Sequence, residues 1–222
     1  MKKLCLLFSF LFCLLLTLSG CKEPFTLEKS VSELRSDLFY GESSSYTVKA
    51  GYGFKEEPYF NDGKVGDVVS TLTFRLLNKE TDLATYSLSF ENDGEVYTAD
   101  FKLNPVKNSL TASVEIDHFN QKNFTVTVHS SSSSEQVVLK STLPPNTLTY
   151  QDALLHLQKE QVNLISHYLD QDGNFNAELY VRVIVKDELP YWYVGFASGN
   201  EQLKALLVDG TNGEVLAIRE IF

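Results

Sequence analysis

Alternation of apolar and polar side chains over residues 85–128 is the feature that most constrains the fold. Polar residues, mostly Thr, Ser, Asp, Glu and Lys, separate the apolar positions in four successive runs. A period of two is typical of antiparallel strands with one buried and one solvated face. The apolar rows are Tyr86, Leu88 and Phe90; Tyr97, Ala99, Phe101 and Leu103; Leu110, Ala112, Val114 and Ile116; and Phe124, Val126 and Val128.

Turn signals separate these runs and extend the pattern on both sides. Asn92-Asp93-Gly94, Asn61-Asp62-Gly63 and Asn104-Pro105 are sequences that favour chain reversal. Five consecutive serines, 130–134, are typical of a solvated hairpin loop. Further strands are predicted near residues 46–54, 68–77 and 136–143. About seven strands at hairpin spacing predict a small antiparallel β-sandwich over residues 41–143.

Residues 21–40 precede this region and predict a tether followed by one short helix. Leu27, Val31, Leu34 and Leu38 have helical spacing, and Ser30 with Glu33 fits a capping box. We therefore expect a helix over residues 26–39 that packs on the following domain.

A second domain is expected after the proline-rich linker at residues 144–148. Pro144 and Pro145 disfavour both helix and strand pairing. Thr149 begins a predicted amphipathic helix that runs to about Asp170. Four strand-like stretches follow, at residues 178–187, 191–198, 203–209 and 214–222. The chain is therefore predicted to be mainly β, with an α+β unit at residues 149–222.

This last third of the chain resembles the PepSY domain family. The resemblance rests on the helix, on the strand that contains 191-YWYVGF-196 and above all on the hairpin 207-LVDGTNGEVL-216. PepSY domains combine a helix with a β-meander and occur in metalloprotease propeptides and envelope proteins. The resemblance therefore implies a helix-plus-meander fold and an inhibitory or regulatory contact with a peptidase.

The N-terminus predicts an extracytoplasmic address. Lys2 and Lys3 precede an apolar run that is too short to span a bilayer comfortably, which is the layout of a signal peptide over residues 1–20. The following 18-LSGC-21 resembles the lipobox of bacterial lipoproteins. That family attaches a diacylglycerol to the cysteine thiol and cleaves before it, so the resemblance assigns lipidation to Cys21. A simple secretory signal that happens to end in cysteine is the alternative.

Cleavage at this point changes the charge and cysteine content of the chain. Cys5 and Cys13 leave with the signal, and lipid occupies the remaining thiol, so no disulfide or cysteine metal site is expected. Loss of Lys2 and Lys3 takes the formal net charge from -10 to -12. This acidic balance argues against a nucleic-acid partner. The expected location is the extracytoplasmic face of the bacterial cell membrane, or the outer membrane in a two-membrane cell.

No catalytic or cofactor motif emerges from the sequence. The four histidines, His118, His129, His156 and His167, accompany no recognised nucleophile arrangement. Residues 170–174, DQDGN, do not fit an EF-hand, because its first and last ligand positions would fall on Tyr168 and Leu179. A helix-ending turn explains them better. We therefore expect a protein that is not an enzyme and that carries no cofactor and no metal.

The strongest candidate binding residues are Tyr180, Arg182, Tyr191 and Tyr193. Leu179 and Val181 alternate with the first pair, and Trp192 and Val194 with the second. If the apolar row lies under the helix, the Tyr and Arg row lies on the opposite face of the sheet. Tyr and Arg suit protein recognition because they combine contact area with hydrogen bonding. The same face could instead pack against the β-sandwich as an interdomain surface.

These observations favour a membrane-anchored envelope lipoprotein that binds a protein or peptide and regulates a peptidase. The partners expected are the lipid bilayer, through lipidated Cys21, and another envelope protein or peptide. The alternative is an extracytoplasmic small-molecule or metal-binding lipoprotein associated with a transporter.

Overall fold

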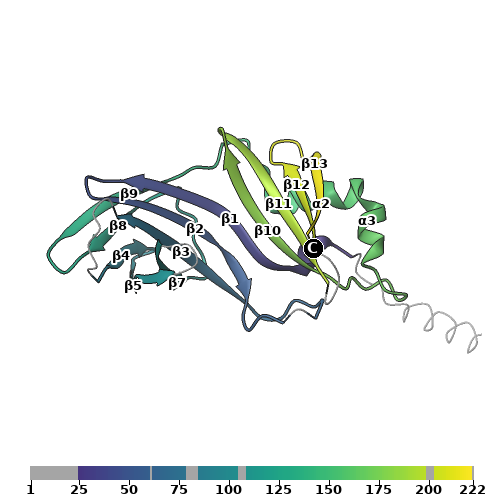
Figure 1. The fold of residues 1–222 in the computed structure, drawn as a ribbon, viewed down its shortest axis with the longest axis horizontal. Helices are drawn as coiled ribbons and strands as arrows, with labels where there is room; N and C mark the ends of the chain where they lie inside the picture. Colours follow the sequence, from purple (N-terminus) through teal and green to yellow (C-terminus); the bar gives the residue numbers. More distant parts are fainter. Residues whose placement is uncertain (1–24, 61, 79–84, 105–108, 199–202, 222) are drawn as a thin grey trace, which may run out of the picture.

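The computed structural model describes residues 25–60, 62–78, 85–104, 109–198 and 203–221. The predicted signal peptide, Cys21 and Pro105 lie outside the described residues. Within them the chain is mainly β, as predicted, with strands from both halves joined in one curled sheet (Figure 1). The sheet runs in the order β13-β12-β11-β10-β1-β2-β3-β7-β6, and a branch β9-β8-β4-β5 starts from β1.

Within the described residues the first half of the chain supplies nine strands. The eight after residue 40 correspond to about seven predicted runs, because the run that contains Tyr97 to Leu103 is divided between β5 and β6. The turn between β4 and β5 contains Asp93 and Gly94, both at positive φ, as a tight hairpin requires. The serine run lies in the hairpin between β8 and β9, as predicted. The strands are β1 (Val31–Glu42), β2 (Tyr46–Glu56), β3 (Val68–Asn78), β4 (Ser87–Asn92), β5 (Glu95–Asp100), β6 (Lys102–Asn104), β7 (Ser109–Glu115), β8 (Asn123–His129) and β9 (Ser134–Ser141).

Strand β1 corrects the prediction of a tether and short helix over residues 21–40. A single 3-10 turn, η1 (Leu27–Ser30), precedes an extended strand that crosses both halves of the molecule (Figure 1). The helix prediction for residues 26–39 is therefore wrong. Leu27 reaches the core from the 3-10 turn, and a register shift between Arg35 and Asp37 changes the phase of the strand. Together these two irregularities place apolar residues at the intervals that are expected of a helix.

The second half contains a helical segment and a four-stranded meander, close to the predicted order. The expected single helix over residues 149–170 is interrupted at Gln161, whose backbone is not helical. The elements are α2 (Tyr150–Glu160), α3 (Val162–His167), β10 (Glu178–Lys186), β11 (Leu189–Ala197), β12 (Leu203–Asp209) and β13 (Val215–Ile221).

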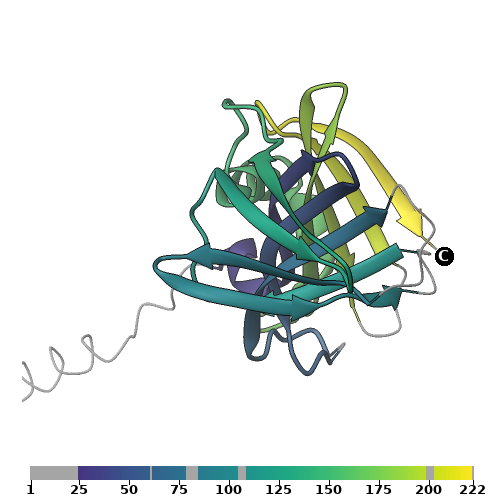
Figure 2. The same ribbon diagram turned by 90° about the vertical axis from the view of Figure 1, so that its left-hand side faces the viewer.

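Two hydrophobic clusters lie on the same face of the continuous sheet. The first cluster fills the curl between β1-β2-β3-β7 and the β9-β8-β4-β5 branch, and Phe74, Leu88 and Val126 are fully buried in it. The second lies between β10-β11-β12 and the helices, and it contains Leu157, Leu179 and Trp192. Figure 2 shows the helices on one side of the sheet. In the described part of the chain, no helix covers the other side. The uncovered side carries the candidate residues.

Strand β1 connects the two clusters because it pairs with three partners. Its first part lies parallel to β10, with Leu34 opposite Val181. From Glu33 to Glu42 it pairs antiparallel with β2, and Phe39 and Tyr40 near its end pair with β9. The segment expected to be a tether is therefore the strand that joins the two halves of the sheet.

Candidate binding face

The four candidate residues lie together on the uncovered side of β10 and β11. Arg182 is directly opposite Tyr193, and Tyr191 is opposite Ile184. The alternating residues Leu179, Val181, Trp192 and Val194 are buried in the second cluster, as the pattern predicted. All four candidate side chains are half-buried. The alternation that fixes the core side therefore also places these residues on one surface.

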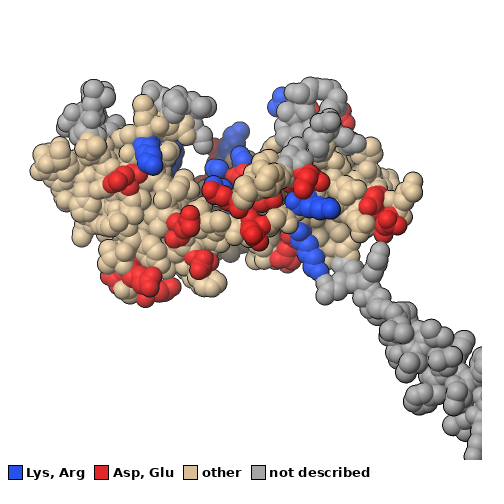
Figure 3. All heavy atoms as spheres, turned by 90° about the horizontal axis from the view of Figure 1, so that it is seen from below, with Lys and Arg blue, Asp and Glu red and all other residues tan. Residues whose placement is uncertain are grey.

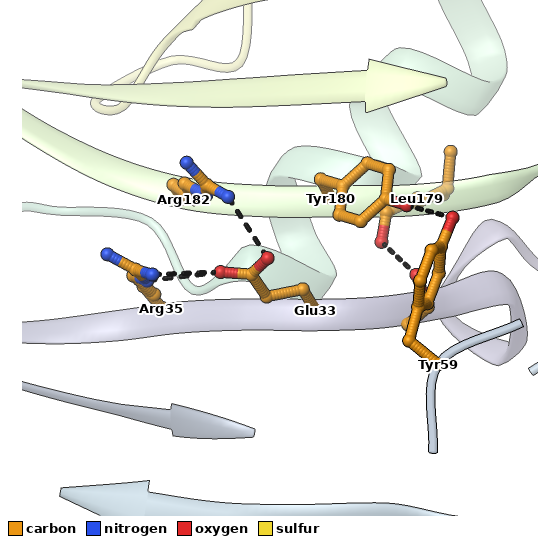
Figure 4. A network of polar contacts seen from close by, with 7 residues as sticks. Glu33, Arg35, Tyr59, Leu179, Tyr180 and Arg182 are labelled. Carbon is orange, nitrogen blue, oxygen red and sulfur yellow. Dashed lines mark hydrogen bonds and ion pairs between the residues drawn. The ribbon is translucent and has the colours of Figure 1, made fainter. Parts of the chain in front are cut away.

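Tyr180 marks the end of this row that contacts the first half of the chain. Its hydroxyl donates a hydrogen bond to the hydroxyl of Tyr59, from the connection between β2 and β3, and the two rings are 6.1 Å apart (Figure 4). Burial raises the pKa of Tyr180 above its usual range. Burial, followed by the contact with Tyr180, also raises the pKa of Tyr59. Both phenols are therefore protonated at neutral pH.

Arg182 takes part in a charged network at the boundary between β10 and β1. Its Nη2 lies 3.0 Å from Oε2 of Glu33, and Nε of Arg35 donates to Oε1 of the same carboxylate at 3.1 Å (Figure 4). One carboxylate thus holds two guanidinium groups in place. Nε of Arg182 is buried and makes no hydrogen bond with the described residues. The Arg182 side chain as a whole is 43% exposed, so its accessible part can contact a ligand.

Tyr191 and Tyr193 form the more open end of the row. Within the described residues their hydroxyls have no hydrogen-bond partner. Tyr193 is paired through the backbone with Arg182 and with Leu207 of β12. The face therefore has two parts: Tyr180 and Arg182 contact the first half of the chain, whereas Tyr191 and Tyr193 keep free polar ends.

Two buried carboxylates, which the sequence analysis did not identify, lie at the base of the same region. Glu178 begins β10 and Glu56 ends β2, and they are 0% and 5% exposed. Oε1 of Glu178 accepts hydrogen bonds from the backbone N–H groups of Asp62 and Gly63, both at 3.2 Å, and Oε1 of Glu56 accepts one from Gly66 at 2.9 Å. Both glutamates therefore hold the connection between β2 and β3 in place by accepting hydrogen bonds from its backbone.

Burial raises the pKa of Glu178. The Gly63 N–H opposes this change, and the nearby charge of Glu56 adds to it. Oε2 of each carboxylate is buried without a hydrogen-bond partner among the described residues. Glu178 is the first residue of its strand and Glu56 the last of its own, so neither lies within a run of alternating apolar and polar residues. The pattern of apolar residues therefore could not reveal this pair.

The remaining sequence candidates are structural. Oδ1 of Asp170 accepts hydrogen bonds from the backbone of Asp172 and Asn174, which is the geometry of a turn. His156 packs against Gly213 of the β12–β13 turn, where a Cβ atom would lie 2.5 Å from the imidazole Cγ. In the described part of the chain, no three His, Cys, Asp or Glu side chains are arranged to hold a metal ion.

Comparisons with known proteins give no relative: no family model, curated protein or solved structure matches the chain. Across the described residues, no helix has the length and apolar character needed to cross a membrane.

Proposed function

We propose that the protein is a lipid-anchored lipoprotein of the bacterial envelope that binds another envelope protein or a peptide. Its anchor is the lipidated Cys21 of the sequence 18-LSGC-21, and its binding surface is the row Tyr180, Arg182, Tyr191 and Tyr193. The chain carries no recognised catalytic motif, and we propose a binding role and not an enzymatic one. We also propose that residues 41–143 are a β-sandwich and that residues 149–222 are a PepSY-like domain.

The observation that carries the proposal is the chemistry of the uncovered side of β10 and β11. Tyr191 and Tyr193 present half-buried rings and hydroxyls without partners in the described part of the chain, beside Arg182, whose side chain is 43% exposed. Aromatic rings and arginine are enriched where proteins contact each other. Because residues 149–222 resemble PepSY domains, we propose that the partner is a peptidase and that the contact regulates its activity.

Photo-crosslinking in the native envelope tests the binding surface. A photoreactive amino acid replaces Tyr191 or Tyr193 in the anchored protein, and captured partners are identified by mass spectrometry. Val96 is a matched control, because it is 72% exposed on β5 and lies away from the candidate face. Capture of one envelope protein from both tyrosine positions and not from Val96 supports the proposal. Crosslinks only within the chain, or equal capture from Val96, contradict it.

The anchor is tested separately by metabolic labelling with a fatty-acid analogue. We expect label on the wild-type protein and none on Cys21→Ser, which also leaves the membrane fraction. A labelled Cys21→Ser variant would contradict the assignment of the anchor.

A further inference from the structure

The candidate row is one part of a larger basic face. Strand pairing continues from β13 through β10 and β1 to β7, and the residues paired across these strands share one side of the sheet. Arg182 lies beside Arg35, Arg35 beside Gly53, and Gly53 beside Thr71. Both hydrophobic clusters lie on the other side. We define the basic face as the side of this sheet that carries Tyr180, Arg182, Tyr191 and Tyr193.

Basic side chains outnumber acidic ones on this face, although the protein as a whole is acidic. Glu33 is already paired with Arg35 and Arg182. Register places the basic residues Arg35, Lys49, Lys55, Arg75, Lys102, Arg182, Lys186 and Arg219 on the face, together with the acidic residues Glu33, Glu42, Glu115, Glu178, which is fully buried, and Asp209. A basic surface on a chain with net charge -10 indicates a partner of opposite charge.

Two arginines on the face, Arg75 and Arg182, are half-buried. Nε of Arg75, on β3, is buried without a partner in the described structure, as is Nε of Arg182 on β10. The strands β1 and β2 lie between them, and Arg75 is four residues along β3 from Thr71, the residue in line with Arg182. Three strand spacings and this offset put the two backbone positions about 20 Å apart. A single ion cannot contact both. An extended peptide of about six residues has the required length.

Small residues separate the two arginines. Gly51 and Gly53 on β2 face Thr73 and Thr71 on β3, so the side chains of these two strands are small in the middle of the face. The space-filling view shows Lys and Arg side chains, with acidic side chains beside them, between the two halves of the molecule (Figure 3). We call this part of the sheet, which has small residues on β2 and β3 and a basic group toward each side, the trough.

We infer that this trough binds an acidic polypeptide segment in an extended conformation. This inference rests on the proposed function and names the chemistry of its partner. Carboxylates of the segment form ion pairs with the half-buried side chains of Arg75 and Arg182, because opposite charges are complementary across an interface. The rings of Tyr191 and Tyr193 contact the segment next to Arg182. A polypeptide uses both the charges and the aromatic rings, whereas a simple anion uses only the charges.

Fluorescence anisotropy with the full-length lipoprotein in phosphatidylcholine nanodiscs tests the inference. The probe is a labelled twelve-residue peptide of alternating Glu and Ser, and the reference probe replaces every Glu with Gln. We expect the acidic probe to bind at least tenfold more tightly, and its affinity to fall as salt is raised, because exposed charges are screened. Equal binding of the two probes would overturn the inference.

Charge reversal identifies the surface that is responsible. The double variant Arg75→Glu/Arg182→Glu should weaken binding of the acidic probe at least tenfold. Lys122→Glu/Lys159→Glu makes the same change in net charge at exposed positions off the basic face, and should change binding less than twofold. Arg75→Gln/Arg182→Gln, with circular dichroism to check folding, repeats the test if the first variant does not fold. Equal losses in face and control variants would overturn the inference.

Two further outcomes separate the inference from the proposed function. Tighter binding of inorganic polyphosphate or of phosphatidylglycerol vesicles than of the acidic probe would overturn the polypeptide assignment in favour of a phosphate ligand. If Tyr191 and Tyr193 still crosslink to one envelope protein in the Arg75→Glu/Arg182→Glu variant, the proposed function stands and the acidic-segment inference fails. Loss of that capture, with retention in Lys122→Glu/Lys159→Glu, supports both.

Discussion

The two halves of the sheet form their cores in different ways. The first cluster is formed almost entirely by strands close in sequence, and its centre is a group of rings that includes Phe39, Phe119 and Phe124, with Phe119 and Phe124 only 4.9 Å apart. The second cluster needs residues from both ends of the chain: Leu27, Val31 and Leu34 pack with α2 and with β10 to β12. The meander therefore depends on a strand that precedes the whole first half.

This difference makes β1 the strand through which the two halves are expected to unfold together. Val31 pairs with Leu179, whereas Phe39 belongs to the first cluster. A change deep in either cluster should therefore lower the stability of the whole molecule. The predictions below test that expectation, beginning with the largest effects.

Removing the largest buried ring of each cluster should destabilise one common unfolding transition. Trp192 is buried in the second cluster and its Nε1 donates a hydrogen bond to the carbonyl of Leu148 at 3.1 Å, whereas Phe74 is buried in the first. We expect Trp192→Ala and Phe74→Ala each to lower the free energy of unfolding by about 3–5 kcal/mol. Urea unfolding followed by circular dichroism measures this. Two separate transitions, of which each variant shifts only one, would show that the halves unfold independently.

A methyl group at Gly53 should disturb the junction itself. Its Cβ atom would lie 1.8 Å from the carbonyl oxygen of Leu34, so β1 and β2 would have to separate. We expect Gly53→Ala to cost about 1–3 kcal/mol. Gly51→Ala is the matched control on the same strand, because its nearest contact would be 3.5 Å from the oxygen of Asp37, and we expect little change. Equal thermal stability of the two variants would contradict the close approach of β1 to β2.

Local patterns predicted much of each half and little of how the halves join. Alternation correctly identified the buried rows that contain Leu88, Val126 and Val181, because side-chain direction in a strand depends only on neighbouring residues. Helical spacing misassigned residues 26–39, because a 3-10 turn and a register shift produced the same intervals. The interruption of the helix at Gln161 also had no strong sequence signal.

The candidate face shows the same limit. The sequence placed Tyr180, Arg182, Tyr191 and Tyr193 on one side of two adjacent strands, which the structure also does. The sequence could not place Arg75 on this face. Arg75 is on β3, and β3 is joined to β10 through β2 and β1. The last link is the parallel pairing of β1 with β10, in which Val31 lies opposite Leu179. Pairing between residues so distant in sequence is set by the complete core and not by local periodicity.

The cap of α2 tests whether a change confined to the second half affects the whole molecule. The hydroxyl oxygen of Thr149 accepts a hydrogen bond from the backbone N–H of Asp152 at 3.2 Å. Thr149→Ala should lower the free energy of unfolding by about 1 kcal/mol. Gln151→Ala, at an exposed position in the first turn, should have almost no effect. A loss of helical signal in Thr149→Ala before the strands unfold would show that α2 unfolds alone.

The smallest effect is expected at Glu178, which holds the first half's β2–β3 connection at the start of β10. Gln keeps the size of the side chain and an oxygen that accepts from Asp62 and Gly63, and it replaces the ionisable oxygen by a neutral amide NH2 group. Burial raises the pKa of Glu178 above its usual 4.5 in the folded chain. The folded state therefore binds the proton more tightly than the unfolded state does. Its stabilising contribution is complete below pH 4.5 and is lost as pH rises through the folded pKa.

We therefore expect Glu178→Gln to gain stability relative to wild type as pH rises from 5 to 8. Thermal unfolding across this range measures the difference, and the nearby carboxylates Glu33 and Glu56 are the same in both proteins. Glu188→Gln, at an exposed position in the β10–β11 hairpin, should show no such trend. A constant difference at every pH would mean that the charge on Glu178 is balanced in the folded state. The ionised form of Glu178 would then stabilise the β2–β3 connection with no net cost for the burial of its charge.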